Sequence, residues 1–181
     1  MKKLFIVATV LLTSIFANAQ FQTASLTAAG LTCAMCTKAI YNSLEKIPAV
    51  EKVDADIKSS QFLITFKKDA SIDPDQLKNA VEDAGFSISR LKLTGNFNHI
   101  PVNSDTHVEI GGKAFHFVKS SDKVLDGTQT ITMVDKNYVT AKEFKKVAAL
   151  TDHPCVETGK AEECCAKMGS THNERIYHVM L

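Results

Sequence analysis

Tryptophan is absent from this 181-residue sequence, and aromatic residues make up only 7% of it. Proteins that bind single-stranded nucleic acids by stacking use exposed aromatic side chains, so this scarcity argues against that class. Charge of one sign is lacking too, because 21 Lys and Arg residues oppose 20 Asp and Glu residues and give a net charge of +1. Binding to nucleic acids depends on clustered positive charge. The composition therefore predicts no nucleic-acid partner.

A hydrophobic run long enough to cross a membrane is also missing. The apolar run Leu4 to Leu12 falls short of the roughly 18 residues that a span requires. Lys2 and Lys3 precede this run and Ala17-Asn18-Ala19 follows it, a pattern typical of a cleaved signal peptide. We therefore expect residues 1–19 to be a signal peptide, with an uncleaved anchor as the alternative. The mature chain is then exported to the periplasm or the outside, without a stable membrane span.

Motifs for common enzyme chemistry are lacking as well. The sequence contains neither a Gly-rich phosphate loop nor a Gly-x-Ser-x-Gly nucleophile elbow. We therefore expect that the protein is not an enzyme. It does contain five cysteines, at positions 33, 36, 155, 164 and 165. Thiols of exported proteins tend to oxidise unless a metal ion holds them. The cysteines are therefore the informative residues.

Hydrophobic periodicity over residues 21–94 predicts one small α+β domain. Alternating and helical patterns follow one another in the order strand 23–29, helix 34–47, strand 53–57, strand 62–66, helix 74–84 and strand 86–93. Asp73-Pro74 resembles an N-cap followed by proline at the first helical position, and Gly85 is placed to end that helix. The order βαββαβ is the ferredoxin-like arrangement.

The sequence after Thr94-Gly95-Asn96, which we interpret as a domain boundary, is mostly strand-like. Candidate strands at 108–110, 113–118 and 128–134 are separated by Gly111-Gly112 and Asp126-Gly127. Thr140 and Glu143 match a capping box, which predicts a helix over 141–150, and residues 176–181 form a last candidate strand. We expect residues 97–181 to form a second, small β-rich α+β domain or a partly closed barrel.

Cys33 and Cys36 lie where the first strand gives way to the first helix. The unpaired N–H groups and the positive dipole at a helix start favour anionic thiolates, and two intervening residues let both sulfurs converge on one ion. Thiolates select soft metals, and a pair of them suits an ion that prefers two linear ligands, such as Cu(I) or Hg(II). Structural Zn(II) usually has four protein ligands, so Zn(II) is a weaker candidate. The pair is predicted to bind a metal ion.

The segment Gly30-Leu31-Thr32-Cys33-Ala34-Met35-Cys36, within a βαββαβ unit, resembles the heavy-metal-associated domain over about residues 21–93. This family includes copper chaperones, domains of copper-transporting ATPases and the periplasmic mercury-binding protein. The resemblance implies a ferredoxin-like fold and soft-metal binding by Cys33 and Cys36. Leu31 replaces the Met that is common in the family at a position that typically packs inward. Phe86 matches the aromatic residue of the ATPase domains and the mercury protein.

These observations predict an exported protein that binds a soft metal ion, most of all Cu(I), and transfers or sequesters it. The expected partner is a metal donor or acceptor of the cell envelope. One alternative is a thiol–disulfide redox protein that uses the same cysteine pair. Others are a mercury-scavenging protein and an interaction module whose second domain recognises an envelope partner.

Soft-metal donors also cluster near the C-terminus, namely His153, Cys155, Cys164, Cys165, Met168 and His172. Adjacent cysteines rarely bond to each other, so we expect Cys155 to form a disulfide with Cys164 or Cys165. A second metal site that includes His153 and His172 is the alternative. The remaining histidines (His99, His107, His116 and His178) stand singly in strand-like segments, and we interpret them as ordinary surface or core residues.

Overall fold

The computed structural model describes residues 20–31, 33–162, 165 and 174–181. The expected signal peptide lies outside these residues. The elements, in chain order, are β1 (Gln20–Ala29), α1 (Ala34–Glu45), β2 (Val50–Asp56), β3 (Gln61–Phe66), α2 (Pro74–Asp83), β4 (Ser87–Val102), β5 (Thr106–Ile110), β6 (Lys113–Phe117), β7 (Lys123–Met133), α3 (Ala141–Ala148), α4 (Cys155–Thr158) and β8 (Ile176–Met180).

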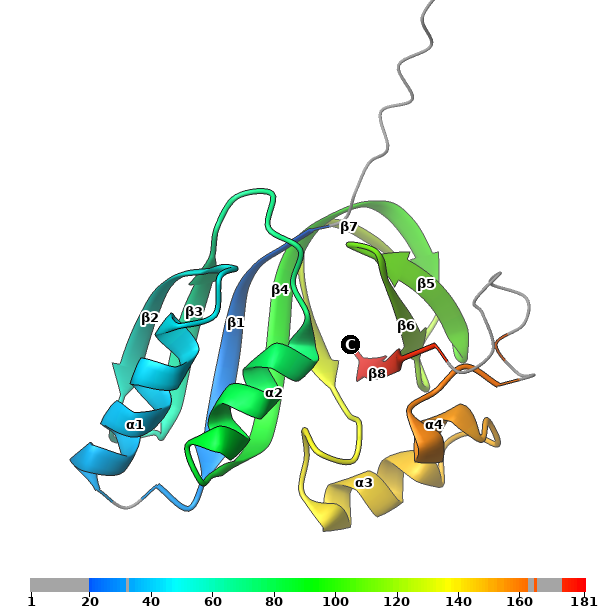
Figure 1. Cartoon of the computed structure of the whole chain (residues 1–181). Coiled ribbons are helices and arrows are strands. Elements are labelled where there is room, and N and C mark those ends of the chain that lie inside the picture. Colours follow the sequence, from blue (N-terminus) through cyan, green and yellow to red (C-terminus); the bar gives the residue numbers. More distant parts are fainter. Residues whose placement is uncertain (1–19, 32, 163–164, 166–173) are drawn as a thin grey trace, which may run out of the picture.

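The first half has the expected ferredoxin-like arrangement. Its strands are antiparallel neighbours in the order β2-β3-β1-β4, and α1 and α2 cover one face of them (Figure 1). Phe62, Ile64 and Phe66 on β3 are buried, as their alternation predicts. Ile40 and Leu44 are the buried apolar residues of α1. The sequence pattern therefore identified these core residues, whereas Ala55 and Ile57, which alternate with polar residues in the strand expected at 53–57, are exposed.

Local capping determines where α2 begins and ends. The Asp73 carboxylate accepts a hydrogen bond from the backbone N–H of Asp75 at 3.0 Å, and Pro74 occupies the first helical position. Gly85 follows the helix with a φ of +86°, a conformation that glycine adopts without strain. α1 ends at Glu45, two residues before the expected end at Ile47.

The boundary expected at Thr94-Gly95-Asn96 is not a loop, because these residues lie inside β4. The strand continues to Val102 and pairs with β1 on one side and β7 on the other. A Cβ atom at Gly95 would come within 2.6 Å of the backbone oxygen of Gln20. This glycine thus permits a close approach between β1 and β4 and does not mark a linker.

The second half continues the same sheet, whose full order is β2-β3-β1-β4-β7-β8-β6-β5. Asp126-Gly127, expected to separate strands, lies within β7. Opposite it, the β4–β7 register shifts between Phe97 and Ile100, and the Asp126 carboxylate accepts a hydrogen bond from the backbone N–H of His99 at 3.2 Å. The turn-like sequence therefore forms an irregularity in a strand pair. The capping box of Thr140 and Glu143 is present at the start of α3.

The largest hydrophobic cluster of the described residues runs through both halves. Phe21 of β1 contacts Phe97 and Phe115 edge to face, with ring centroids 6.2 and 5.5 Å apart. These residues belong to a buried cluster that also contains Leu26 near the N-terminus and Val179 near the C-terminus. The packing therefore joins segments that the sequence assigned to separate domains.

A polar network on the first turn of α2 connects it to the C-terminal half. The Tyr177 hydroxyl donates to the Asp73 carboxylate at 2.6 Å, and the Tyr138 hydroxyl donates to the Asp75 carboxylate at 2.7 Å. Arg175 donates to Asp75 through Nε at 3.0 Å and to a carboxylate oxygen of Asp135 through a terminal nitrogen at 3.1 Å. These contacts fix α2 against the second half.

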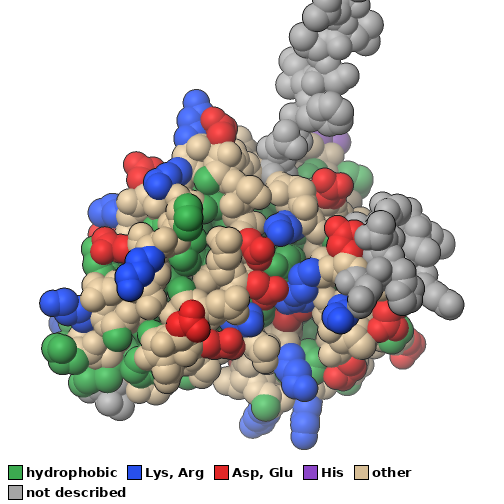
Figure 2. All heavy atoms as spheres, viewed as in Figure 1, with side chains coloured by type: hydrophobic (Ala, Val, Ile, Leu, Met, Phe, Trp, Pro, Cys, Tyr) green, Lys and Arg blue, Asp and Glu red, His purple; other side chains and the backbone are tan. Residues whose placement is uncertain are grey.

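Charges of both signs are interspersed over the face of the molecule shown in Figure 2. This distribution agrees with the balanced composition. Within the part of the chain that the structure describes, no helix is long and apolar enough to cross a membrane.

Candidate metal centre

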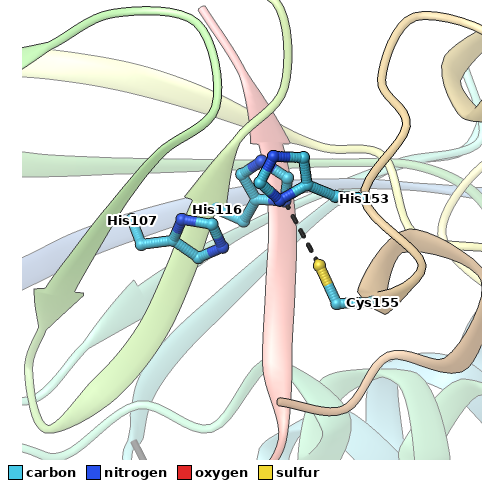
Figure 3. A group of neighbouring side chains, drawn as sticks. All are labelled: His107, His116, His153 and Cys155. Carbon is cyan, nitrogen blue, oxygen red and sulfur yellow. Dashed lines mark hydrogen bonds between the residues drawn. The ribbon is translucent and has the colours of Figure 1, made fainter. Parts of the chain in front are cut away.

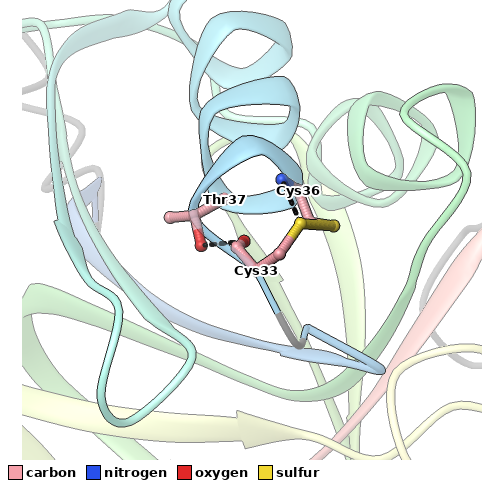
Figure 4. Close-up of a disulfide and its surroundings, with 3 residues drawn as sticks. All are labelled: Cys33, Cys36 and Thr37. Atoms are coloured by element: carbon pink, nitrogen blue, oxygen red, sulfur yellow. Dashed lines mark hydrogen bonds between the residues drawn. A yellow bond between two sulfur atoms is a disulfide. The ribbon is translucent and has the colours of Figure 1, made fainter.

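Cys33 is the N-cap of α1 (Figure 4). Its backbone is extended, with φ −145° and ψ 155°, and its sulfur accepts a hydrogen bond from the backbone N–H of Cys36 at 3.3 Å. The Cys33 carbonyl accepts the Thr37 N–H at 3.2 Å and the Thr37 hydroxyl at 3.4 Å. Because Thr37 is buried, these bonds fix the loop to the body of the domain.

The structure places Cys33 and Cys36 together at the protein surface. Cys33 is exposed and Cys36 is half-buried, their Cα atoms are 5.4 Å apart, and their sulfurs form a disulfide. The convergence of the two sulfurs that the spacing predicts is therefore observed. The pair is therefore oxidised in this structure, and two-electron reduction converts the disulfide into two thiols.

The electrostatic environment of this loop suits negative charge. Both cysteines lie at the N-terminal end of α1, where backbone N–H groups carry partial positive charge, and the first turn of α1 contains no acidic residue. A reduced pair is thereby favoured in its thiolate form. Such a pair offers two soft ligands to an incoming ion.

The residues around the pair divide between core and surface. Leu31 and Phe86 are half-buried and pack against the hydrophobic core, as expected for Leu31. Met35, between the two cysteines, is 75% exposed. The loop thus has a fixed base and an accessible tip.

The C-terminal donors are positioned differently from the expectation. His153 and Cys155 lie beside His107 and His116, and one donor atom from each of the four lies within 4.8 Å of all the others (Figure 3). His107 and His116 were expected to stand singly, but the strand register places them opposite each other on β5 and β6. His116 is a buried, hydrogen-bonded histidine, which agrees with its interpretation as an ordinary core residue. His99 is exposed, as an ordinary surface histidine is.

Three of the expected C-terminal donors, Cys164, Met168 and His172, lie outside the described residues. The predicted disulfide between Cys155 and one of the adjacent cysteines therefore stays a prediction. Cys155 and Cys165 are both buried. Burial and the neighbouring His107 and His178 lower the pKa of His116 to about 3, so its imidazole is neutral at ordinary pH.

Comparison with known proteins agrees with the ferredoxin-like fold of the first half. The family model of the heavy-metal-associated domain matches residues 25–87, which contain the loop and most of the βαββαβ unit. The chain belongs to the heavy-metal-associated domain family.

Among curated proteins, the chain is similar to periplasmic components of mercuric transport. It is 37% identical over 91 residues to the mercuric transport protein periplasmic component of Salmonella typhi, an alignment that covers 49% of this chain and 97% of that protein. Its counterpart from Serratia marcescens is 33% identical over 94 residues, covering 51% of this chain and all of that protein. These alignments span about half of the present chain.

Among solved structures, the chain matches the crystal structure of oxidized MerP from Ralstonia metallidurans CH34. The identity is 33%, the match covers 39% of this chain and 96% of that chain, and the TM-score is 0.36.

Proposed function

We propose that this protein is an exported carrier that captures a soft metal ion with Cys33 and Cys36 and passes it to a partner. The observation that carries the proposal is the position of both sulfurs at the exposed start of α1, with their Cα atoms 5.4 Å apart. A metal ion is the cargo of this site. It binds when the disulfide has been reduced and both thiols lose their protons to solvent.

Hg(II) is the ion we favour. The sequence analysis favoured Cu(I), although a pair of thiolates suits either ion. The curated relatives named above are mercuric transport proteins that align over nearly their whole length, and this similarity supports Hg(II). Cu(I) remains the second candidate on the chemistry of the two sulfurs.

Ligand exchange is the mechanism that the geometry supports. An exposed two-coordinate ion can be attacked by a thiolate of a partner, which forms a three-coordinate intermediate. Cys33 and Cys36 then leave in turn, and each takes up a proton or remains a thiolate. Since Cys33 is exposed and Met35 projects into solvent, the partner can reach the ion without unfolding the loop. This arrangement favours transfer over permanent storage, and no enzymatic reaction is required.

Export of the protein is part of the same proposal. The charged start, the apolar run and the small residues before Gln20 support a signal peptide, and the relatives are periplasmic components by name. The partner would then be another thiol protein of the cell envelope.

A competition experiment with the reduced full chain tests the choice of ion. The protein is reduced with a dithiol, the dithiol is removed under argon, and Hg(II) and Cu(I) are then added in competition with a chelator of known affinity for each ion. We expect one equivalent of Hg(II) at the loop, mobile enough to move to a small dithiol acceptor within minutes. Selective retention of Zn(II) over both soft ions would contradict the proposal.

The redox alternative has its own test, because the pair forms a disulfide in the structure. A disulfide oxidoreductase reduces or oxidises a model disulfide substrate with many turnovers. We expect no such turnover from the metal-free protein. Robust turnover that disappears in Cys33→Ser would favour the redox function over the carrier function.

A further inference from the structure

A second group of metal-binding side chains lies on the sheet formed by β5, β6 and β8, apart from the cysteine loop. The register places His107 opposite His116 and His116 opposite His178, so the three imidazoles form a row across three strands on one face. The rings of His107 and His116 stack with centroids 4.2 Å apart. His153 and Cys155, at the start of α4, cover this row (Figure 3).

Hydrogen bonds to carboxylates fix the orientation of two of these rings. His116 Nε2 lies 3.0 Å from a carboxylate oxygen of Asp105, and His178 Nδ1 lies 2.9 Å from a carboxylate oxygen of Asp135. Because an ionised carboxylate only accepts hydrogen bonds, these two nitrogens carry the hydrogens. In a neutral ring the other nitrogen then has a lone pair. Metal-binding histidines are characteristically held by carboxylates in this way.

Both of those lone pairs point at one sulfur. Cys155 Sγ lies 3.6 Å from His116 Nδ1 and 3.5 Å from His178 Nε2. A thiol has one hydrogen and can donate it to only one of two acceptors. A single S–H group therefore leaves one of these two nitrogens without a hydrogen, and a cation held between the sulfur and His116 Nδ1 would engage the lone pair of that nitrogen.

Two further histidines complete the donor set. His107 Nδ1 lies 3.1 Å from the backbone oxygen of Asp105. Since a carbonyl only accepts, Nδ1 donates, and the lone pair of Nε2 faces the Cys165 sulfur at 3.4 Å. His153 Nδ1 is buried and has no hydrogen-bond partner within the described part of the chain. Buried polar atoms are nearly always satisfied, so this nitrogen is itself an indication of a missing ligand.

We propose that His107, His116, His153 and Cys155 bind one Zn(II)-type ion in a closed, tetrahedral site of three imidazole nitrogens and one thiolate sulfur. Zn–N bonds of about 2.0–2.1 Å and a Zn–S bond of about 2.3 Å at a tetrahedral angle separate the nitrogen from the sulfur by about 3.5 Å. The His116–Cys155 distance of 3.6 Å matches this value. On binding, the Cys155 thiol releases its proton to solvent, and His178 remains beside the sulfur.

This site differs in kind from the cysteine loop. His116 and Cys155 are fully buried, whereas Cys33 is exposed, so an ion held here would stay in place rather than be handed on. It would join the β5–β6–β8 end of the sheet to α4. The proposal does not depend on metal binding by Cys33 and Cys36.

The test uses the full mature chain with Cys33→Ser and Cys36→Ser, so that only the second site is measured. The reduced, metal-stripped protein is titrated with Zn(II) against a chelating dye, and separately with Co(II). We expect one equivalent of Zn(II), a higher Tm with Zn(II) bound, and a thiolate-to-Co(II) charge-transfer band with tetrahedral d–d bands.

Matched variants assign the ligands. Cys155→Ser should abolish the charge-transfer band, and His153→Gln, on the half-buried loop, should weaken Zn(II) binding by at least about 100-fold, beyond the 10–100-fold typical of outer hydrogen-bond partners. His99→Asn, at an exposed histidine, should leave binding unchanged. Circular dichroism verifies the fold of each variant.

Two results would overturn the proposal. One is the absence of stoichiometric Zn(II) binding by the folded, reduced Cys33→Ser, Cys36→Ser protein, or binding that survives in both Cys155→Ser and His153→Gln. The other comes from alkylation and mass spectrometry of exported protein before reduction. A disulfide at Cys155 in that protein would exclude a thiolate ligand there.

Discussion

At the scale of single residues, Gly95 shows how one missing side chain allows two strands to pair closely. Its Cβ position lies 2.6 Å from the backbone oxygen of Gln20, and neither backbone can move without disturbing the β1–β4 pairing. Any side chain at position 95 would be excluded by this contact and not by the backbone conformation.

We therefore expect Gly95→Ala to destabilise the protein by about 1–3 kcal/mol, the usual cost of overpacking. At a site with open space and an ordinary φ, replacing Gly by Ala would stabilise the protein by about 0.4–1 kcal/mol, because it lowers the conformational entropy of the unfolded chain. The sign of the change in unfolding free energy therefore distinguishes the two cases. Denaturant unfolding measures it. Gly112→Asn is the comparison for backbone conformation, since Gly112 has a left-handed φ of +76° and nothing near its Cβ position; because Asn tolerates that conformation, we expect it to cost less than Gly95→Ala. Equal stability of Gly95→Ala and the unmutated protein would contradict the account.

Cys33 stabilises the start of a helix, because its sulfur caps α1. Serine is a strong N-cap and alanine is a poor one. In the reduced, metal-free protein we expect Cys33→Ser to keep the stability and Cys33→Ala to lose about 1 kcal/mol. Thermal and urea unfolding of the two variants checks this, and indistinguishable curves would show that the cap contributes nothing.

At the scale of elements, α2 is fixed by ion pairs whose strength depends on pH. Burial raises the pKa of Asp75, but hydrogen bonds from Arg175 and Tyr138 outweigh burial and hold that pKa below its usual value of 3.8. The unfolded chain therefore takes up a proton at this carboxyl before the folded chain does. The stabilisation is fully present above about pH 4 and is lost as the pH falls through the folded pKa.

We expect Asp75→Asn to lower Tm at pH 7 and to flatten the fall of Tm between about pH 4 and pH 2. Asp122→Asn, at an exposed carboxyl, is the matched control. Calorimetric scans of both variants across this range provide the measurement. If Asp75→Asn kept the full acid-induced loss of stability, the network on α2 would not have the assigned role.

The elements also show what sequence reasoning can reach. Capping signals at Asp73-Pro74 and Thr140 predicted helix starts correctly, and alternation on β3 predicted its buried face, because these patterns depend on local chemistry. Cys33 and Cys36 were found because they are close in sequence and precede a helix. Their role as metal ligands stays a prediction.

The histidine row was not found, because it depends on register. His107, His116 and His178 are far apart in sequence, and only the antiparallel β5–β6 and parallel β6–β8 pairings align them. Strand register is fixed by the sheet as a whole and a shift of one residue would reverse the face of every side chain. The sequence signal that could have indicated this row was the presence of histidines in neighbouring candidate strands.

At the scale of the whole molecule, the continuous sheet and the shared core determine how the chain unfolds. β4 pairs with strands of both halves, and the buried cluster extends from Phe21 to Val179. Two independent domains would lose their structure separately. A single sheet should unfold as one unit.

We expect one calorimetric transition, with a calorimetric enthalpy equal to the van't Hoff enthalpy. The oxidised, metal-free chain is the sample, because ion binding would add a separate contribution to Tm. Two transitions, or a calorimetric enthalpy near twice the van't Hoff value, would support the independent second domain over residues 97–181 that the sequence suggested.

The central claim, that Cys33 and Cys36 hold the transported ion, is tested most directly by Hg(II) binding to protein in which Cys155, Cys164 and Cys165 are replaced by Ser. We predict that each reduced chain binds one Hg(II). The affinity should fall at least about 100-fold in Cys36→Ser, which is more than an outer hydrogen-bond partner typically contributes. Met35→Ala, at the exposed tip of the same loop, should leave the affinity unchanged. Unchanged Hg(II) affinity in Cys36→Ser would contradict the account.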